Sequence, residues 1–317
     1  MVRSRVAFVA TFLLSLCFDG FVLALEPKPF VQSGQRIVFL GDSNTFRGEY
    51  IALLETWLRQ HHPEGQWTLI NLGLPSETAS GLSEPAHSYP RPCIHTRLEA
   101  ALEKSKPDVA VLCYGTNDGI YYPFSEERFT AYREGITKLI TACRRAKAKI
   151  VLMTPPPFDP EPMRKSGQLK PAGEKEYAWS SPYEGYDQVM AKYTQWVLSQ
   201  SDAADIVVDI RTPMLASEKP KGREGSVPTM LPDSIHYNLE GHRIVALKLW
   251  AAWGLAPTNP ADGQSEQLFS IVSRRQQILR DAWLTHVGHK RPGMTAGLPL
   301  DEAETMADEI LKASGVR

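Results

Sequence analysis

The sequence predicts a three-layer α/β/α sandwich built around a five-stranded parallel sheet. Five short apolar runs are spaced along the chain, and longer stretches with helical periodicity separate them. Runs that are this short and this apolar suit strands that are buried on both faces of a parallel sheet. Strands that alternate with helices form a doubly wound α/β domain, which a helical C-terminal extension follows here.

The five predicted strands are apolar over nearly their whole length. They occupy residues 36–40, 68–72, 108–114, 149–154 and 206–210. In such a sheet the carboxyl ends of the strands share one edge, and ligands bind at that edge. We therefore expect the functional residues in the loops that directly follow these strands.

The stretches between the strands carry the three- and four-residue spacing of amphipathic helices. Helices are expected over residues 50–61, 126–146, 186–199 and 239–253. In the second of these, one apolar stripe faces the core. It consists of Phe129, Tyr132, Ile136, Leu139, Ile140 and Cys143.

Two regions do not follow the alternation. Residues 155–182 are rich in Pro, Lys, Glu and Gly and come after a strand, which indicates a long surface loop on the ligand-binding side. This loop is either a mobile linker or a lid that walls the substrate site, and its composition favours neither. Residues 256–317 form the extension, with helical periodicity over 263–289 and 301–313. No catalytic motif is evident in the extension, so we expect it to pack on the main domain or to mediate an oligomer contact.

The charge balance disfavours two classes of partner. The chain has 35 basic and 36 acidic side chains, a formal net charge of −1. It therefore has no overall field that would attract nucleic acid or an anionic membrane surface. A hydrophobic content of 43% with 22% charged residues is that of an ordinary folded globular protein.

The first 24 residues resemble a secretory signal peptide. Arg3 and Arg5 precede the apolar run 6–18, and Val22-Leu23-Ala24 provides a suitable cleavage site. Asp19 and Gly20 interrupt the run short of the roughly 20 residues that a membrane span needs. We therefore expect cleavage near Ala24, export to a periplasm or out of the cell, and no stable membrane anchor afterwards.

Signal cleavage would leave three cysteines, Cys93, Cys113 and Cys143. The number is odd, and Cys113 lies in a predicted buried strand, so at most one disulfide is expected. Cys93 with Cys143 is the pair to consider, although free thiols are the favoured state.

A serine follows the first predicted strand, in Gly41-Asp42-Ser43-Asn44-Thr45. A serine at a turn from strand to helix exposes its hydroxyl, and the helix N–H groups point at developing negative charge. Gly-Asp-Ser is also ordinary turn and N-cap chemistry, so this motif alone does not assign a nucleophile.

Two further polar clusters are expected at the same edge of the sheet. Tyr114-Gly115-Thr116-Asn117-Asp118-Gly119 ends the third strand, and its asparagine amide is able to donate to an oxyanion. Asp233-Ser234-Ile235-His236 precedes the helix expected from residue 239. An Asp and a His at this spacing meet when the loop curls, so the carboxylate holds the imidazole in one tautomer. Turn residues without chemistry are the alternative for both clusters.

Together, the three clusters resemble the SGNH hydrolase superfamily, also called the GDSL esterases and lipases, over a domain assigned to residues 33–255. The resemblance implies a flavodoxin-like fold and a serine esterase that needs no cofactor and no metal. It implies that Ser43 is the nucleophile, that His236 is the general base and that Asp233 orients the histidine.

The resemblance also implies an oxyanion hole made by the N–H groups of Ser43 and Ser76 and the side chain of Asn117. Ser76 stands in Asn71-Leu72-Gly73-Leu74-Pro75-Ser76-Glu77-Thr78, where the family commonly has glycine. A serine keeps the N–H but adopts a positive φ far less easily than glycine does. Gly73 is the fallback donor, with tight packing as its alternative role.

His242 competes with His236 because it also follows Asp233, but it falls in the first turn of a predicted helix. A structural role is therefore expected for it. The three residues would suffice as ligands of a catalytic zinc. That interpretation is disfavoured because it leaves Ser43 and Asn117 without a purpose.

The segment 84–95 should overhang the site and mixes an aromatic residue, an arginine and two histidines. The candidate substrate contacts are Asn44, Tyr89, Arg91 and His95. A polar and aromatic lining suits a sugar ester better than a long lipid chain. We therefore expect a small-molecule or glycan ester as substrate, with deacetylation of carbohydrate as the reaction. A general carboxylesterase, lipase or acylhydrolase is the alternative, and a glycan-binding module without catalysis is the non-enzyme alternative. The sequence does not indicate an oligomeric state.

Overall fold

The computed structural model describes residues 28–217, 230–313 and 315. The proposed signal peptide, residues 1–24, lies outside this part of the chain. Among the residues that the structure describes, no helix is both long enough and apolar enough to cross a membrane.

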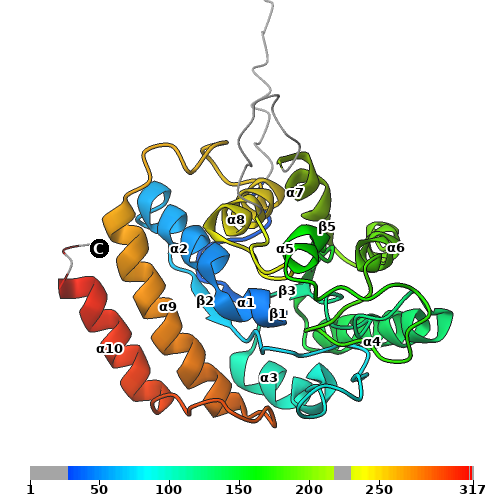
Figure 1. Ribbon diagram of the computed structural model, residues 1–317. Coiled ribbons are helices and arrows are strands. Elements are labelled where there is room, and N and C mark those ends of the chain that lie inside the picture. The colour runs from blue at the N-terminus through cyan, green and yellow to red at the C-terminus, as the bar shows by residue number, and fades with distance from the viewer. Residues whose placement is uncertain (1–27, 218–229, 314, 316–317) are drawn as a thin grey trace, which may run out of the picture.

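A five-stranded parallel sheet forms the centre of the molecule, as the sequence predicts (Figure 1). The strand order is β2-β1-β3-β4-β5, and every neighbouring pair is parallel. The strands are β1 (Arg36–Gly41), β2 (Thr68–Asn71), β3 (Val109–Cys113), β4 (Lys149–Met153) and β5 (Ile206–Val208). The chain proceeds from β1 to one side and then returns to place β3 on its other side. This topological switch point puts a crevice beyond the carboxyl ends of β1 and β3.

Alternation along the strands divides the core into two layers. Val38 and Leu40 of β1 point into the layer with helices α3, α4 and α6, whereas Ile37 and Phe39 point into the layer with α2 and α8. The two-residue period of a strand explains this division. The helices that cover the sheet are α2 (Glu49–His61), α3 (Leu98–Ser105), α4 (Glu126–Arg145), α6 (Tyr186–Leu198), α7 (Arg211–Ser217) and α8 (Leu239–Trp253).

The C-terminal extension is helical, as expected, and belongs to the same body as the sheet. Helix α9 (Glu266–Val287) lies against α2 and β2, and α10 (Leu300–Ala313) lies along α9 (Figure 1). Ala282 and Trp283 of α9 and Ala303 of α10 are buried in the same core layer as Val38 and Leu40. The extension is therefore a packed part of the molecule and not an appended tail.

Residues 155–182 carry local structure of their own. They contain α5 (Pro160–Lys165) and an isolated bridge between Ala178 and Ser181. The backbone N–H of Trp179 donates to the buried carboxylate of Glu84 at 3.3 Å. These contacts favour a fixed wall over a linker.

The remaining short elements lie in loops. They are α1 (Ser43–Arg47) and the 3₁₀ helix η1 (Ile94–Thr96). Cys93, Cys113 and Cys143 are free thiols, so the Cys93–Cys143 pair considered above is not formed.

Candidate active site

Ser43 is the first residue of α1, and only Asp42 separates it from the end of β1. Asp42 caps this helix, since its side chain accepts from the backbone N–H of Asn44 at 2.9 Å. Asp42 is only 3% exposed, and this burial raises the pKa of its carboxyl to about 6. The serine is thus held by a buried cap on a rigid turn.

The side chains of Ser43, His236 and Asp233 form a continuous hydrogen-bonded chain. Nε2 of His236 lies 2.8 Å from Oγ of Ser43, and its Nδ1 lies 2.7 Å from Oδ2 of Asp233. Oδ1 of Asp233 accepts from the backbone N–H groups of Ile235 and His236 at 3.0 and 2.7 Å. This is the geometry of a nucleophile, its base and an orienting carboxylate.

Asp233 stays ionised in this arrangement. Partial burial on its own raises the pKa of its carboxyl, but the hydrogen bonds from His236 and Ile235 outweigh burial and hold the pKa well below its usual range. An ionised Asp233 fixes the proton of the imidazole on Nδ1. Nε2 is then free to accept the proton of Ser43.

Asn44 was expected to contact substrate, but the structure places it beneath the site. It is 1% exposed, its Nδ2 donates to the carbonyl of Ile235 at 3.2 Å, and its Oδ1 accepts from the N–H of Tyr237 at 3.0 Å. These bonds join α1 to the loop that carries His236. Asn44 therefore holds His236 in place relative to Ser43 and does not line the cavity beside Ser43.

Ser76 adopts the backbone conformation that glycine favours. Its φ is 68°, in the left-handed region, which an L-residue with a Cβ adopts only at a cost. Within the described chain its backbone N–H makes no hydrogen bond to another protein group. The serine therefore keeps both the shape and the free donor that the glycine pattern provides.

Gly73 serves a packing role. Its N–H already donates to Oδ1 of Asn71 at 2.9 Å, so the N–H is not free for an oxyanion. A Cβ at this position would lie 2.3 Å from the backbone nitrogen of Phe46, much closer than atoms can approach. Gly73 lets the loop after β2 pass directly over α1, and we do not retain it as a fallback donor.

Asn117 follows β3 and is oriented from both ends of its amide. Its Oδ1 accepts from the hydroxyl of Tyr121 at 3.0 Å, and its Nδ2 donates to the carbonyl of Glu77 at 3.2 Å. An amide nitrogen has two protons, so one remains for a ligand in the cavity. Tyr121 is buried and stacks on Tyr186, with ring centroids 4.9 Å apart. The sequence motif did not reveal Tyr121, because it lies outside the polar cluster that signals the turn.

Two buried ion pairs support the loop after β2. Arg91 grips Glu84 with two nitrogens, at 2.6 and 2.7 Å, and also donates to the carbonyl of Ser76 at 3.3 Å. Arg97 grips Glu77 in the same way, with two bonds of 2.6 and 2.7 Å. Paired, bidentate contacts offset the cost of burying these charges.

These side chains open into a cavity of about 370 Å³. Ser43, Ser76, Asn117 and His236 form its floor, and its walls include side chains from distant segments. These wall residues are Tyr89, Arg91, Tyr121, Trp179 and Arg291. Trp179, from the loop after β4, is 47% exposed, and Arg291 comes from the C-terminal extension. The sequence had indicated no functional residue in that extension.

Tyr89 and Arg91 line the cavity as expected, but His95 does not. His95 lies in a separate hollow beside α3 and α4, together with Leu98 and Lys138. His95 lies in η1, a short turn directly before α3, and borders the hollow there rather than the cavity beside Ser43. We therefore do not retain it as a substrate contact.

His242 is buried away from the cavity, and its Nε2 lies 2.9 Å from the carboxylate of Glu49. Its ring stacks on Tyr50 with centroids 5.9 Å apart. His242 faces Glu49, whereas His236 faces Asp233. Asp233, His236 and His242 therefore do not come together as the ligands of a zinc site. No group of three potential metal ligands gathers anywhere in the residues with described positions.

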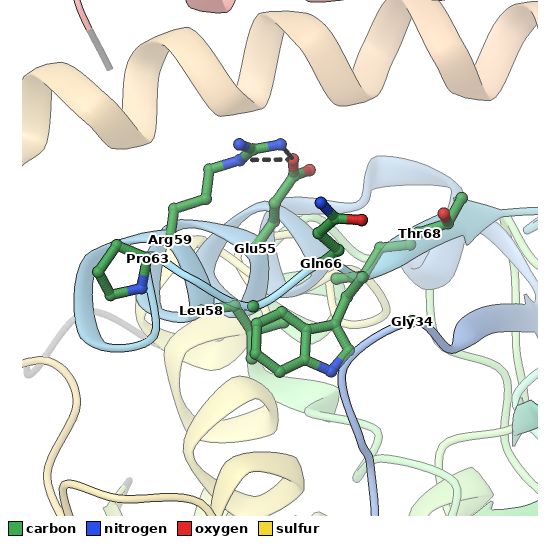
Figure 2. A pocket seen from close by; sticks show the side chains of 10 residues that line it. Gly34, Glu55, Leu58, Arg59, Pro63, Gln66 and Thr68 are labelled. Carbon is green, nitrogen blue, oxygen red and sulfur yellow. Dashed lines mark hydrogen bonds and ion pairs between the residues drawn. The ribbon is translucent and has the colours of Figure 1, made fainter. Parts of the chain in front are cut away.

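A second hollow of about 370 Å³ lies at the opposite edge of the sheet, where Thr68 begins β2 (Figure 2). The carboxylate of Glu55 in this hollow is already neutralised by Arg59 and Arg275, each 2.7 Å away. This hollow therefore contains an internal ion-pair network and lies at the opposite edge of the sheet from Ser43.

Comparison with known proteins agrees with this architecture. The model of the GDSL-like Lipase/Acylhydrolase family matches residues 39–244, about two thirds of the chain. Two solved mutants of Axe2, an acetyl-xylooligosaccharide esterase from Geobacillus stearothermophilus, share the fold at 20% identity. Their TM-scores are 0.53 and 0.54, over 71% and 72% of this chain and 96% and 98% of theirs.

A gut microbial diltiazem-metabolizing enzyme has the same fold, with a TM-score of 0.53 at 20% identity. The match covers 72% of this chain and 48% of that one. No curated protein matches the chain. The family match, together with a serine, a histidine and an aspartate brought into contact at the switch point of the sheet, leads to one conclusion: this chain belongs to the GDSL-like lipase/acylhydrolase family and is an ester-hydrolysing serine hydrolase.

Proposed function

We propose that this protein is an exported carbohydrate esterase that removes acetyl groups, with Ser43 as nucleophile, His236 as general base and Asp233 as the orienting carboxylate. The observation that carries the proposal is the 2.8 Å contact between Oγ of Ser43 and Nε2 of His236, on the floor of an open cavity. Such a contact lets the histidine take the serine proton as attack begins.

The proposed reaction has two halves. Oγ of Ser43 attacks the ester carbonyl while His236 takes its proton, and the oxyanion lies among the N–H groups of Ser43 and Ser76 and Nδ2 of Asn117. The imidazolium then gives its proton to the departing sugar hydroxyl. Water attacks the acyl-enzyme with His236 again as base, which releases acetate and restores the serine.

The proposed substrate class follows from the size and lining of the cavity. A volume of about 370 Å³, with Tyr89, Trp179 and Arg91 in its walls, suits a short acyl group on a polar alcohol. Aromatic faces pack against sugar rings, and the polar groups satisfy hydroxyls. The similarity in fold to an acetyl-xylooligosaccharide esterase supports the same class of substrate.

Substrate profiling tests the proposal. Acetylated xylo-oligosaccharides should be hydrolysed with a higher kcat/KM than long-chain aryl esters, and kcat/KM should fall along an acyl series from acetate to octanoate. A maximum at long acyl chains would replace the proposal with a general carboxylesterase or lipase.

The nucleophile is tested separately by a variant. Ser43→Ala should lower kcat by about 10⁴- to 10⁶-fold with an unchanged circular dichroism spectrum. A fluorophosphonate probe should label the unaltered protein and not the variant. Absence of labelling in both proteins would indicate a glycan-binding module.

Export is proposed from the sequence of the first 24 residues alone. The full chain, expressed in a bacterium, should appear outside the cytoplasm with a new amino terminus near residue 25. Recovery of the intact chain in the cytoplasmic fraction would contradict this part of the proposal.

A further inference from the structure

The wall of the cavity beside Ser43 contains one arginine, Arg291, whose guanidinium forms no ion pair with any residue that the structure describes. Arg291 lines the cavity, yet it has no carboxylate partner in the part of the chain that the structure describes. Arg91, the other arginine of the wall, is fully engaged with Glu84. No aspartate or glutamate among the described residues lines this cavity, and the ionised Asp233 lies behind the ring of His236, so Arg291 is the unpaired charge in the cavity wall.

Arg291 is held in place by groups that leave its charge exposed to a ligand. Its Nε donates to the carbonyl of Pro75 at 2.9 Å, and its Nη1 donates to the carbonyl of Pro292 at the same distance. Its Nη2 donates to no described group. Carbonyl oxygens orient a guanidinium but do not cancel its charge, so the free edge is ready to bind an anion.

The position of Arg291 relative to the reacting atoms is set by Tyr89. The guanidinium carbon lies 5.4 Å from the centre of the Tyr89 ring, and the hydroxyl of that ring lies 3.5 Å from Oγ of Ser76. Pro75, which Arg291 also contacts, directly precedes Ser76 in the chain. A sugar ring that packs on Tyr89 with its ester at Ser43 would thus bring its substituents within reach of Arg291.

From this arrangement we infer that Arg291 is a specificity-determining residue that selects esters whose alcohol part carries a carboxylate, as an acidic sugar does. A carboxylate matches the planar fork of a guanidinium with two parallel hydrogen bonds. The inference rests on the proposed Ser43 site. It assigns to the C-terminal extension a direct part in choosing the substrate.

Matched aryl acetates test the inference without any sugar. The ratio of kcat/KM for 4-acetoxybenzoate to that for its methyl ester measures the preference for the carboxylate. Because the two esters differ in intrinsic reactivity, the ratio of each variant is compared with that of the unaltered protein. Arg291→Gln should lower the ratio about tenfold, mainly through KM for the charged ester, as expected for loss of a hydrogen bond to a charged group.

Two further variants separate charge recognition from support of the loop. Arg291→Lys keeps the charge and should retain part of the preference. Lys290→Gln removes one positive charge from an exposed neighbour outside the cavity and should leave the ratio unchanged. If Arg291→Gln instead lowers kcat/KM equally for both esters in a fully folded protein, Arg291 acts only through Pro75 and the inference is wrong. A stronger preference for 4-acetoxybenzenesulfonate than for the benzoate would overturn the assignment of a carboxylate.

The sugar substrates keep this test distinct from that of the proposed function. Acetylated xylo-oligosaccharides with and without a uronic acid branch form a second matched pair. If no sugar acetate is hydrolysed but the aryl ratio responds to Arg291→Gln, the carbohydrate proposal fails and the charge selection stands. If sugar acetates are hydrolysed with no effect of Arg291→Gln on either ratio, the charge selection fails and the proposed function stands.

Discussion

Arg91 donates from Nη1 to the backbone carbonyl of Ser76 at 3.3 Å, while the rest of its guanidinium is locked to Glu84. Both side chains of the pair are at most 1% exposed. The strained peptide of Ser76 is therefore anchored from the core by a group that cannot move without breaking a buried ion pair. This anchor explains how a serine persists at a φ of 68° in the cavity that Ser43 lines.

A substitution series at Ser76 should separate its backbone from its hydroxyl. Ser76→Gly removes the cost of the left-handed conformation and should raise the free energy of unfolding by about 1 kcal/mol with activity retained. Ser76→Pro deletes the N–H and forces φ near −65°, so kcat should fall by about 100-fold or more. Ser76→Ala should be mild. Thermal melts and kcat are the measurements, and an Ala variant as damaged as the Pro variant would show that the hydroxyl has a role of its own.

Removing one member of the Glu84–Arg91 pair should be worse than removing both. Glu84→Leu leaves a buried guanidinium without its carboxylate, and the free energy of unfolding should fall by about 3–5 kcal/mol. The double variant Glu84→Leu/Arg91→Met leaves no unpaired charge and should recover much of that loss. Only the double variant removes the donor to the carbonyl of Ser76, so it should show a lowered kcat although its stability recovers. Urea unfolding checks the order, and equal stability of the single and double variants would count against it.

The sequence predicts where the site lies because polar residues follow apolar strands at Ser43 and Asn117, and the carboxyl ends of parallel strands share one edge. Asp233 lies in the loop before the helix expected from residue 239, and its spacing to His236 is the signal there. The fold and the family are confirmed on this basis. Asn44 lies next to the nucleophile in sequence, yet it turns under α1 and stays buried. Proximity along the chain does not say on which side of a turn a side chain emerges.

Three residues of the cavity wall could not be predicted from sequence patterns, for a different reason. Tyr121, Trp179 and Arg291 reach the cavity from loops, and tertiary packing alone decides where they point. Arg291 is 248 positions beyond Ser43, on a connection between helices α9 and α10 that has no motif. The spacing of residues along the chain gives no sign that such a loop residue lies beside Ser43.

The Asn117 amide and its Tyr121 partner should contribute unequally. Asn117→Ala removes a side-chain donor to the oxyanion and should lower kcat by about 10²- to 10³-fold with little change in KM. Tyr121→Phe keeps the donor but frees Oδ1 of Asn117, so kcat should fall by a smaller factor, about tenfold. Steady-state kinetics on an aryl acetate measures both. A Phe variant with unchanged kcat would mean that the Glu77 carbonyl alone orients the amide.

The two histidines near Asp233 should have opposite phenotypes. His236→Ala should be nearly as inactive as Ser43→Ala and should melt at a similar temperature to the unaltered protein. His242→Ala opens a cavity beside Tyr50 and leaves Glu49 without the neighbouring ring, so it should lower the free energy of unfolding by about 2 kcal/mol with only a modest loss of rate. The reverse ranking in kcat would assign the base to His242.

Stability should depend on pH through Asp118. Burial raises the pKa of its carboxyl to about 6, well above its ordinary value, although the N–H groups of Ala79 and Ser80 donate to one oxygen. The folded state then binds a proton that the unfolded state has lost, so this contribution to stability is present below pH 4 and disappears as pH rises through about 6. Asp42 shifts in the same direction.

Asp118→Asn should therefore flatten the pH dependence of unfolding. Between pH 4.5 and pH 7 the variant should lose less stability than the unaltered protein, by on the order of 1 kcal/mol. Urea unfolding at the two pH values checks this. The depressed pKa of Asp233 acts in the opposite direction and at lower pH, because its contribution is lost as pH falls below about 4. Identical pH dependence in the variant and the unaltered protein would exclude Asp118 as a titrating group.

Trp283 of α9 is buried among the side chains of the central sheet. A fragment that folds on its own must therefore include α9. A protein cut at residue 244, where the family match ends, would lose the rest of α8 together with α9 and α10, and would leave the apolar core open to water. Such an opened surface promotes aggregation during synthesis. The helices of the extension and the sheet should accordingly melt together in one cooperative transition.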